Sequence, residues 1–159
     1  MRLQRRLRLI EQRDASMDRA LKIAFASSDR KTVDQHFGAA RGLVIHAVWP
    51  DAHQLLEAAE FGDLRQDGGE DKLAIKFQVL EGCAAVYCQA AGASAVGQLL
   101  SLGVQPLKVA PGSPIDALIA ALQAQMRDAP PAWLLRAMRR RAGADPGRFA
   151  ALAAEGWRE

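Results

Sequence analysis

Apolar and polar residues follow two different spacings along the chain. Between residues 21 and 61, short apolar segments bounded by turn residues predict three strands, at 21–27, 41–49 and 53–61. The composition of the third segment would also suit a helix. The short connections favour strands, because strands joined by short turns pair antiparallel as a meander.

From residue 71 onward, apolar residues recur every three or four positions. Leu73, Phe77 and Leu80 have the spacing of one helix face, and Gly82 follows as a stop signal. Periodicity and turn signals together predict helices at 71–82, 92–103, 113–127 and 130–141, with strands at 83–88 and 104–109. Pro106 favours a position at the sheet edge for the last strand.

These elements predict an α/β fold with a mixed five-stranded sheet and helices on both faces. The first three strands are expected to pair antiparallel, and helical crossovers join the later strands in parallel. Strand 83–88 is expected beside strand 21–27. The 159 residues suit one domain, at 21–127, between a basic tail at 1–20 and a basic C-terminal helix and tail at 128–159.

Positive charge is concentrated at both ends of the chain. Residues 1–20 hold six arginines and three acidic residues, and residues 128–159 hold six arginines and four acidic residues. The first segment alternates leucine and arginine without a clean period, which predicts a frayed tail or a short helix. Nucleic-acid-binding proteins usually carry basic residues on a folded face. We therefore expect no nucleic-acid partner, and ends that face solvent or an acidic partner.

The sequence predicts a cytoplasmic monomer without a membrane partner. No apolar run approaches the ~20 residues of a membrane helix, and the N-terminal residues lack the apolar stretch and cleavage site of a signal peptide. In the cytoplasm, thiols are kept reduced.

Cys83 and Cys88 begin and end the predicted strand 83–88. Five steps of about 3.3 Å would place them roughly 16 Å apart and on opposite faces, which excludes a shared zinc ion and a disulfide. Cys83 is interpreted as a buried apolar residue, whereas Cys88 is left open between a functional role and a place in the core. His46 and His53 are interpreted as structural or solvent-facing.

One polar segment, SSDRKTVDQHFG at 27–38, is longer than the 2 to 6 residues that a connection typically needs. In open α/β sheets, ligands gather outside the carboxyl ends of parallel strands. This loop and segment 88–94 are expected to meet there. They would bring together His36, Cys88 and the main-chain amides of residues 89–93, at a helix start that favours an anion.

The neighbours of His36 indicate that its ring is held in place. Phe37 can anchor the loop, and Gly38 permits a turn that side chains would block. Asp34 would either orient the ring or cap the turn. Asp29 and Asp34 also leave open a two-metal carboxylate enzyme, although the sequence lacks a nucleophile elbow, a phosphate-binding loop and a dinucleotide fingerprint.

Several segments resemble the dinitrogenase iron–molybdenum cofactor biosynthesis family. The resemblance covers residues 21–141 and is carried by LKIAFASSDRKTVDQHFG, EFGDL, EDKLAIKFQVLEGCAAVYCQAAGASAVGQLLSLGVQPLKV and AWLLRAMRR. It implies a ribonuclease-H-like α/β fold and a role in nitrogen fixation. It also implies a non-catalytic carrier of the iron–sulfur precursor cluster that NifB makes, with exchange of that cluster with the NifEN scaffold.

The resemblance also implies where the cluster binds. The histidine of the family's D-x-HFG motif corresponds to His36. We expect His36 and Cys88 as metal ligands, Arg30, Lys31, Gln89 and Gly92 as further cofactor-binding residues, and Asp34 behind His36. The family pattern has a further cysteine where this chain has Ala91. Two alternatives remain: an interaction module that binds no cluster and docks through its basic ends, and a metal-dependent phosphoryl-transfer enzyme.

Overall fold

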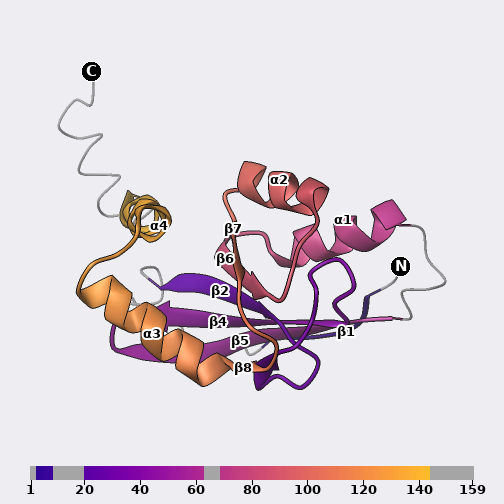
Figure 1. Ribbon diagram of the computed structural model, residues 1–159, viewed down its shortest axis with the longest axis horizontal. Helices are drawn as coiled ribbons and strands as arrows, with labels where there is room; N and C mark the ends of the chain where they lie inside the picture. Colours follow the sequence, from indigo (N-terminus) through magenta and orange to yellow (C-terminus); the bar gives the residue numbers. More distant parts are fainter. Residues whose placement is uncertain (1–2, 9–19, 63–68, 144–159) are drawn as a thin grey trace.

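The computed structural model describes residues 3–8, 20–62 and 69–143 (Figure 1). The main sheet contains β1 (Leu3–Arg8), β2 (Leu21–Ala26), β4 (Gly42–Trp49), β5 (Ala52–Phe61), β6 (Cys83–Cys88) and β7 (Gln105–Lys108). A separate two-stranded sheet pairs β3 (Thr32–Val33) with β8 (Ser113–Pro114). The helices are α1 (Gly69–Val79), α2 (Ala93–Ser101), α3 (Ile115–Arg127) and α4 (Ala132–Gly143).

The main sheet has the order β1-β5-β4-β2-β6-β7. Strands β2, β4 and β5 pair antiparallel as a meander, whereas β2–β6 and β6–β7 are parallel. The predicted α/β class, the mixed sheet, the neighbourhood of β2 and β6 and the edge position of β7 are therefore confirmed. Helices α1 and α2 lie in the crossovers, as parallel pairing requires.

The prediction of a tail or short helix for the first residues is wrong for residues 3–8. They form β1, which pairs antiparallel with β5 and adds a sixth strand to the five expected. The segment has no clear strand period. It can pair because the outer edge of β5 offers a row of main-chain N–H and C=O groups. The other parts of the predicted tails, 9–19 and 144–159, lie outside the described residues.

Helices cover both faces of the sheet, as predicted. One core contains residues of α1 and α2, including Leu80 just after α1 and Leu99, and the other contains residues of α3 and α4, including Ile119 and Leu134. In Figure 1, α1 and α2 lie above the sheet and α3 lies below it. The helix predicted at 130–141 is thus part of the packed domain.

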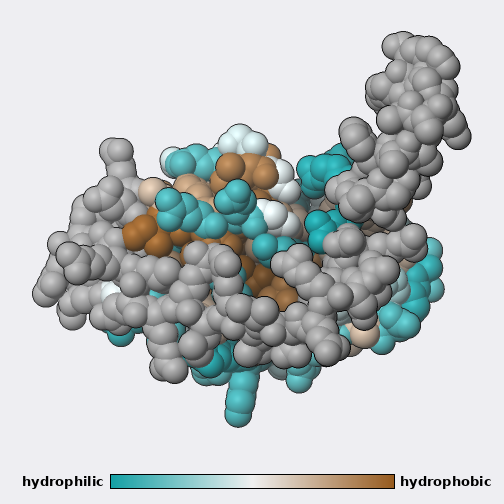
Figure 2. Space-filling view, turned by 180° about the vertical axis from the view of Figure 1, so that it is seen from behind, coloured by the Kyte–Doolittle hydropathy of each residue, from teal (hydrophilic) through white to brown (hydrophobic). Residues whose placement is uncertain are grey.

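The helices cover much of the apolar surface of the sheet. Two large apolar side chains at the C-terminal end of α2 remain exposed. Leu100 and Leu102, at the end of α2, are 52% and 55% exposed. Figure 2 shows brown residues around α2 beside teal ones, seen from behind. No helix in the described ranges has the length and apolar character needed to cross a bilayer.

Candidate functional site at the carboxyl end of the sheet

The loop at 27–38 is anchored first to the start of α3. The β3–β8 pairing holds its middle, and the main-chain N–H of Gly112 donates to the Val33 carbonyl at 2.9 Å. The N–H of Ile115 donates to the Lys31 carbonyl at 2.8 Å. These bonds fix one half of the loop on the α3 side of the sheet.

The other half of the loop is bonded to the segment that follows β6. The N–H of Gln89 donates to the Gln35 carbonyl at 2.9 Å, and the N–H of Phe37 donates to the Ala90 carbonyl at 2.8 Å. His36 lies between these two bonded positions, and its side chain is exposed. The structure thus confirms that the two segments meet at the carboxyl end of the parallel strands.

Asp29 organises the first turn of the loop. Its carboxylate accepts hydrogen bonds from the N–H groups of Lys31 and Thr32, each at 2.8 Å. These main-chain bonds lower the pKa of Asp29 to about 2, since they stabilise the ionised form. Ser27 Oγ donates to Asp29 at 3.1 Å and accepts from the N–H of Arg30 at 2.9 Å. Arg30 is held at φ 66°, a left-handed conformation that non-glycine residues seldom adopt.

Asp34 closes the same loop from its other side. Its carboxylate accepts from the N–H of Ser28 at 2.9 Å and from the Ser28 hydroxyl. These bonds correspond to the capping alternative rather than to an orienting contact with His36. The carboxylates of Asp29 and Asp34 thus both accept hydrogen bonds from other residues of the loop. In the described part of the chain, no group of three or more His, Cys, Asp or Glu residues is placed to hold a metal ion.

Phe37 anchors the loop in the core, as predicted. Its side chain is fully buried, and its ring centroid lies 5.8 Å from that of Phe77. The ammonium group of Lys76, a fully buried residue, donates to the carbonyls of Phe37 at 3.2 Å and Gly38 at 2.6 Å. The main chain on the C-terminal side of His36 is therefore held by an aromatic contact and by a buried cation.

Lys76 was not predicted as a functional residue from the sequence. The signal was its position: it lies three residues after Leu73 and four before Leu80, on the apolar face of α1. A lysine is almost never fully buried without partners. Here its ammonium group has the two loop carbonyls and also lies 5.6 Å from the centre of the Phe61 ring, within range of a cation–π interaction.

The start of α2 is open beside this loop. Gly92 is the N-cap residue, and it makes no side-chain capping bond. A Cβ atom added at Gly92 would meet nothing within 4 Å. The first turn of a helix presents N–H groups without intrahelical partners and a partial positive charge. The site therefore combines an exposed imidazole with main-chain donors that favour an anion.

Both cysteines are buried on the α1 and α2 side of the sheet, so the prediction of opposite faces is wrong. The β2–β6 register shifts between Lys22–Cys83 and Ile23–Ala85, and this irregularity interrupts the alternation of side chains. Both thiols are free. Burial raises the pKa of Cys83 to about 12 and also raises the pKa of Cys88, which is 1% exposed.

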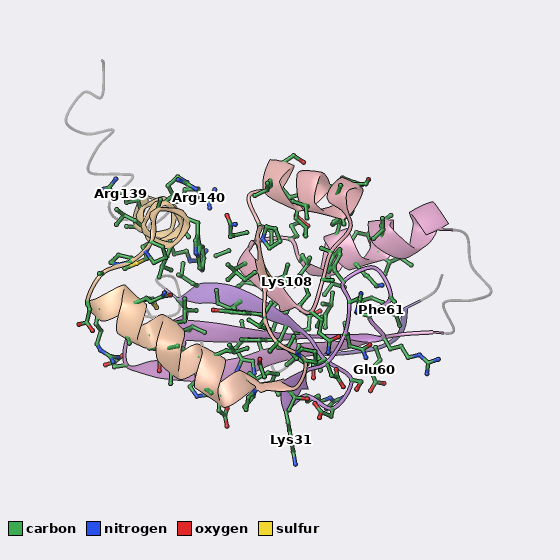
Figure 3. The ribbon with its side chains drawn as sticks, in the orientation of Figure 1. Lys31, Glu60, Phe61, Lys108, Arg139 and Arg140 are labelled. Carbon is green, nitrogen blue, oxygen red and sulfur yellow. The ribbon has the colours of Figure 1, made fainter. Side chains whose placement is uncertain are left out.

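The remaining predicted residues have different surroundings. Arg30 Nη2 lies 3.5 Å from the Glu60 carboxylate, and both side chains are partly exposed. Figure 3 shows Lys31 pointing away from the body of the molecule. Gln89 and Gly92 lie on the segment bonded to the loop, so the structure groups these two with His36. Cys88 lies beneath the surface, and the Lys31 side chain points into solvent.

The other two histidines lie outside this site. His46 is 9% exposed, and its ring meets that of Phe25 edge-on at 5.6 Å. Burial lowers the pKa of His46 to about 4, with a smaller contribution from His53 in the same direction and an opposing one from Asp116. The structural interpretation is confirmed for His46, and His53 is exposed, as expected.

Comparison with known proteins agrees with the resemblance. Residues 19–125 match the family model described as dinitrogenase iron-molybdenum cofactor. The chain is 58% identical to protein NifX of Azotobacter vinelandii, over 87% of this chain and 88% of that protein. It is 36% identical to protein NifX of Herbaspirillum seropedicae, over 77% of this chain and 85% of that protein.

A less similar protein and a solved structure also match this chain. Protein NifY of Azotobacter vinelandii is 29% identical over 84% of this chain and 53% of that protein. The crystal structure of PH0822 superposes with a TM-score of 0.53 at 23% identity, covering 65% of this chain and 89% of that chain, which shows a shared fold. From the family match and the similarity to the two NifX proteins, we conclude that the chain belongs to the dinitrogenase iron–molybdenum cofactor family.

Proposed function

We propose that this protein acts in the biosynthesis of the nitrogenase iron–molybdenum cofactor as a carrier without catalytic activity. Its cargo is the iron–sulfur precursor cluster made by NifB, which it exchanges with the NifEN scaffold in the cytoplasm. One observation carries the proposal. Two main-chain hydrogen bonds join the His36 loop to the segment that opens α2, so that an exposed imidazole lies beside main-chain donors.

The chemistry of the site suits a large anionic cluster. A neutral imidazole is a good ligand for iron, and the amides at the start of α2 can donate to cluster sulfides. Gln89 lies on the same segment, and the partly exposed Arg30 adds positive charge to the loop. A single side-chain ligand at the surface, supported by weaker contacts, would hold the cargo and still allow its transfer.

In this proposal Cys88 supports the site from the core and does not bind the cluster. A thiol must be deprotonated to bind a metal, and burial of Cys88 favours the protonated form. The side chain packs in the same core cluster as Phe37. Cys88→Ala should therefore leave cluster binding close to that of the wild type.

The test is anaerobic cluster transfer followed by gel filtration. Apo-protein is mixed with the NifB-derived cluster, and iron and sulfide are assayed in the protein peak. We expect both to co-elute at a fixed ratio. His36→Ala should weaken retention at least about tenfold, since even the partners of metal ligands contribute 10–100-fold to affinity. His53→Ala is the matched control, because His53 is also exposed but lies on β5.

Thermal unfolding of both variants should match the wild type, since neither exposed ring contributes to the core. If iron elutes only with small molecules, the protein is not a carrier, and an interaction module becomes the better account. If His36→Ala retains as much iron as His53→Ala, the carrier role stands but His36 is not a ligand.

A further inference from the structure

Two exposed leucines at the C-terminal end of α2 lie beside arginines of α4. In the described part of the chain, Leu100 and Leu102 are the exposed large apolar residues. A hollow of about 100 Å³ separates α2 from α4, and its lining includes Leu100, Trp133, Arg136 and Arg140. Figure 3 shows Arg140 on α4. Apolar and cationic side chains thus border the same hollow.

The second leucine borders a larger cavity at the amino end of the parallel strands. This cavity of about 250 Å³ opens between the starts of β2 and β6, the turn after α2 and helix α4, and its lining includes Lys22, Gly82, Leu102, Gly103 and Arg140. It shares Gly103 and Arg140 with the smaller hollow. The two hollows therefore form one surface, called the α2–α4 face and defined by Leu100, Leu102, Trp133, Arg136 and Arg140.

Helix α4 presents its arginines in a row. Trp133, Arg136 and Arg140 follow one another at steps of three and four residues, which places them along one side of the helix. Arg136 and Arg140 are exposed, whereas Leu134 fixes the helix to the core. In the described ranges Arg136 has no acidic partner, and Arg140 Nη2 donates to the Gly103 carbonyl at 3.5 Å. The row is therefore open to carboxylates of another molecule.

The composition of the two helices is typical of a protein–protein contact. Such contacts are enriched in arginine and tryptophan and depleted of lysine, aspartate and glutamate. Helix α4 holds four arginines and one tryptophan, and neither α2 nor α4 holds a lysine, an aspartate or a glutamate. The two leucines lose their contact with water only when another apolar surface covers them.

Charge indicates which kind of molecule covers this face. A second copy bound through the same face in a two-fold dimer would bring the face against itself, and arginines would then meet arginines, which repel. A nucleic acid would satisfy the arginines with phosphates, but its backbone offers no apolar surface to the leucines. A protein surface that combines apolar side chains with carboxylates suits both groups.

We propose that the α2–α4 face docks an acidic amphipathic helix of a partner protein. Such a helix lays apolar side chains at positions i, i+3, i+4 and i+7 against an apolar surface, and they would cover Leu100 and Leu102. Glutamates beside them would pair with Arg136 and Arg140, because arginine presents a planar fork of donors that matches a carboxylate. The twelve residues of α4 span about 18 Å, which suits a partner helix of roughly three turns. Docking is independent of cluster binding.

The test uses a synthetic amphipathic peptide of about 18 residues, long enough to form a helix, with leucines at those positions and glutamates beside them. A second peptide has glutamine in place of every glutamate, which keeps the helix propensity and removes the charge. Fluorescence anisotropy measures the affinity of each peptide for the full chain at about 0.15 M salt. We expect saturable binding of the glutamate peptide, at least about tenfold weaker binding of the glutamine peptide, and NMR shifts at the amides of Leu102 and Gly103.

Two variants separate the apolar contribution from the charged one. Leu102→Ser should weaken binding of both peptides about fivefold, since about half of this side chain remains to be covered. Arg136→Met should weaken binding of the glutamate peptide three- to fivefold, the value of about one exposed ion pair, and leave binding of the glutamine peptide unchanged. Both residues are exposed, so thermal unfolding should match that of the wild type.

Lys108→Met is the matched control for charge. Lys108 is exposed on β7 and lines neither hollow. The change removes one positive charge, as Arg136→Met does, so it should leave the ratio of the two peptide affinities as in the wild type. An equal change of that ratio in Lys108→Met and Arg136→Met would mean that net charge, and not the α2–α4 face, selects the glutamate peptide.

Four further results would overturn the proposal. These are no saturable binding of the glutamate peptide, unchanged affinity in Leu102→Ser, tighter binding of a DNA duplex than of the peptide, and self-association of the chain that Leu102→Ser abolishes. The last two would make a nucleic acid or a second copy the occupant of the face. Iron retention in Leu102→Ser and Arg136→Met should equal that of the wild type, so docking and cluster binding fail separately.

Discussion

At the carboxyl end of the sheet, Asp29 and Asp34 accept hydrogen bonds from the loop that carries His36. At the amino end, Lys22 and Arg140 donate to main-chain carbonyls. At the carboxyl end the carboxylates stabilise the loop through hydrogen bonds, and His36 and main-chain donors lie at the surface. At the amino end the two cations line a cavity.

This difference gives the two ends of the sheet different chemistry. A metal cluster needs a lone pair that can bind iron, and the carboxyl end supplies an imidazole on an anchored loop. The amino end supplies two cations, Lys22 and Arg140, that donate to main-chain carbonyls. The two ends of the same sheet thus differ chemically, and the following changes should affect them unequally.

The largest effect is expected from Lys76→Met. The change keeps the apolar stem but removes the donor of two hydrogen bonds, a buried one to the Phe37 carbonyl and a partly buried one to the Gly38 carbonyl. It should lower the free energy of unfolding by about 2–4 kcal/mol, because two hydrogen bonds from a charged donor are lost. Urea unfolding measures this loss. Hydrogen exchange should rise at residues 35–40 and not at Gly82 and Gly103.

Lys108→Met is the control, because Lys108 is exposed on β7. It should change the free energy of unfolding by less than about 0.5 kcal/mol. Equal exchange rates at the two ends in Lys76→Met would mean that Lys76 stabilises the whole domain and does not position the His36 loop.

The next effect is the loss of stability at acid pH that results from burial of His46. The pKa of His46 is lowered from 6.5 to about 4, chiefly by burial. As pH falls from 6.5 to 4, the unfolded chain therefore binds a proton that the folded chain does not. The free energy of unfolding should fall by up to about 3 kcal/mol over this range and level off below it.

Urea unfolding at pH 7.5 and 4.5 measures this dependence. His46→Leu should remove most of it, whereas His53→Gln should keep most of it, since burial of His46 is the main cause. A His46→Leu protein with the full wild-type pH dependence would show that another group dominates acid destabilisation.

The smallest effect is local to the carboxyl end. The pKa of Asp29 is lowered from 3.8 to about 2, so its bonds to Lys31 and Thr32 are fully present above pH 3.8 and are lost as pH falls through about 2. The cations at the amino end keep their protons in this range. In His46→Leu, the amide signals of Lys31 and Thr32 should shift in this step, and that of Gly103 should not.

Asp29→Asn should abolish the step, because an amide does not titrate there. A shift of the Gly103 signal with the same midpoint would mean that acid opens the whole domain, and the contrast between the two ends would then be lost at low pH.

Most of the fold could be predicted from local patterns. Apolar segments between turn residues identified β2, β4 and β5, and the change to helical spacing identified the crossovers. The pattern failed for β1, because its pairing depends on the edge that β5 offers. It also failed for the faces of Cys83 and Cys88, because a register shift against β2 resets the alternation.

The candidate site was predicted in outline. The length of loop 27–38 and the histidine beside Phe37 indicated an anchored imidazole. The sequence could not show that Lys76 holds this loop, since the two are joined only when α1 packs on the sheet. The cavity at the amino end was also missed, because it unites β2, α2 and α4.

The sequence by itself determined the order of the four helices and of strands β2, β4, β5, β6 and β7, the loop that carries His36 and the resemblance to a family. Each of these depends on neighbours within a few residues or on the sequence itself. Only the tertiary structure decided that Cys88 is buried and that Lys22 meets Arg140 across one cavity. Burial and the approach of distant residues to one cavity are properties of packing, which depends on contacts between residues far apart in the chain.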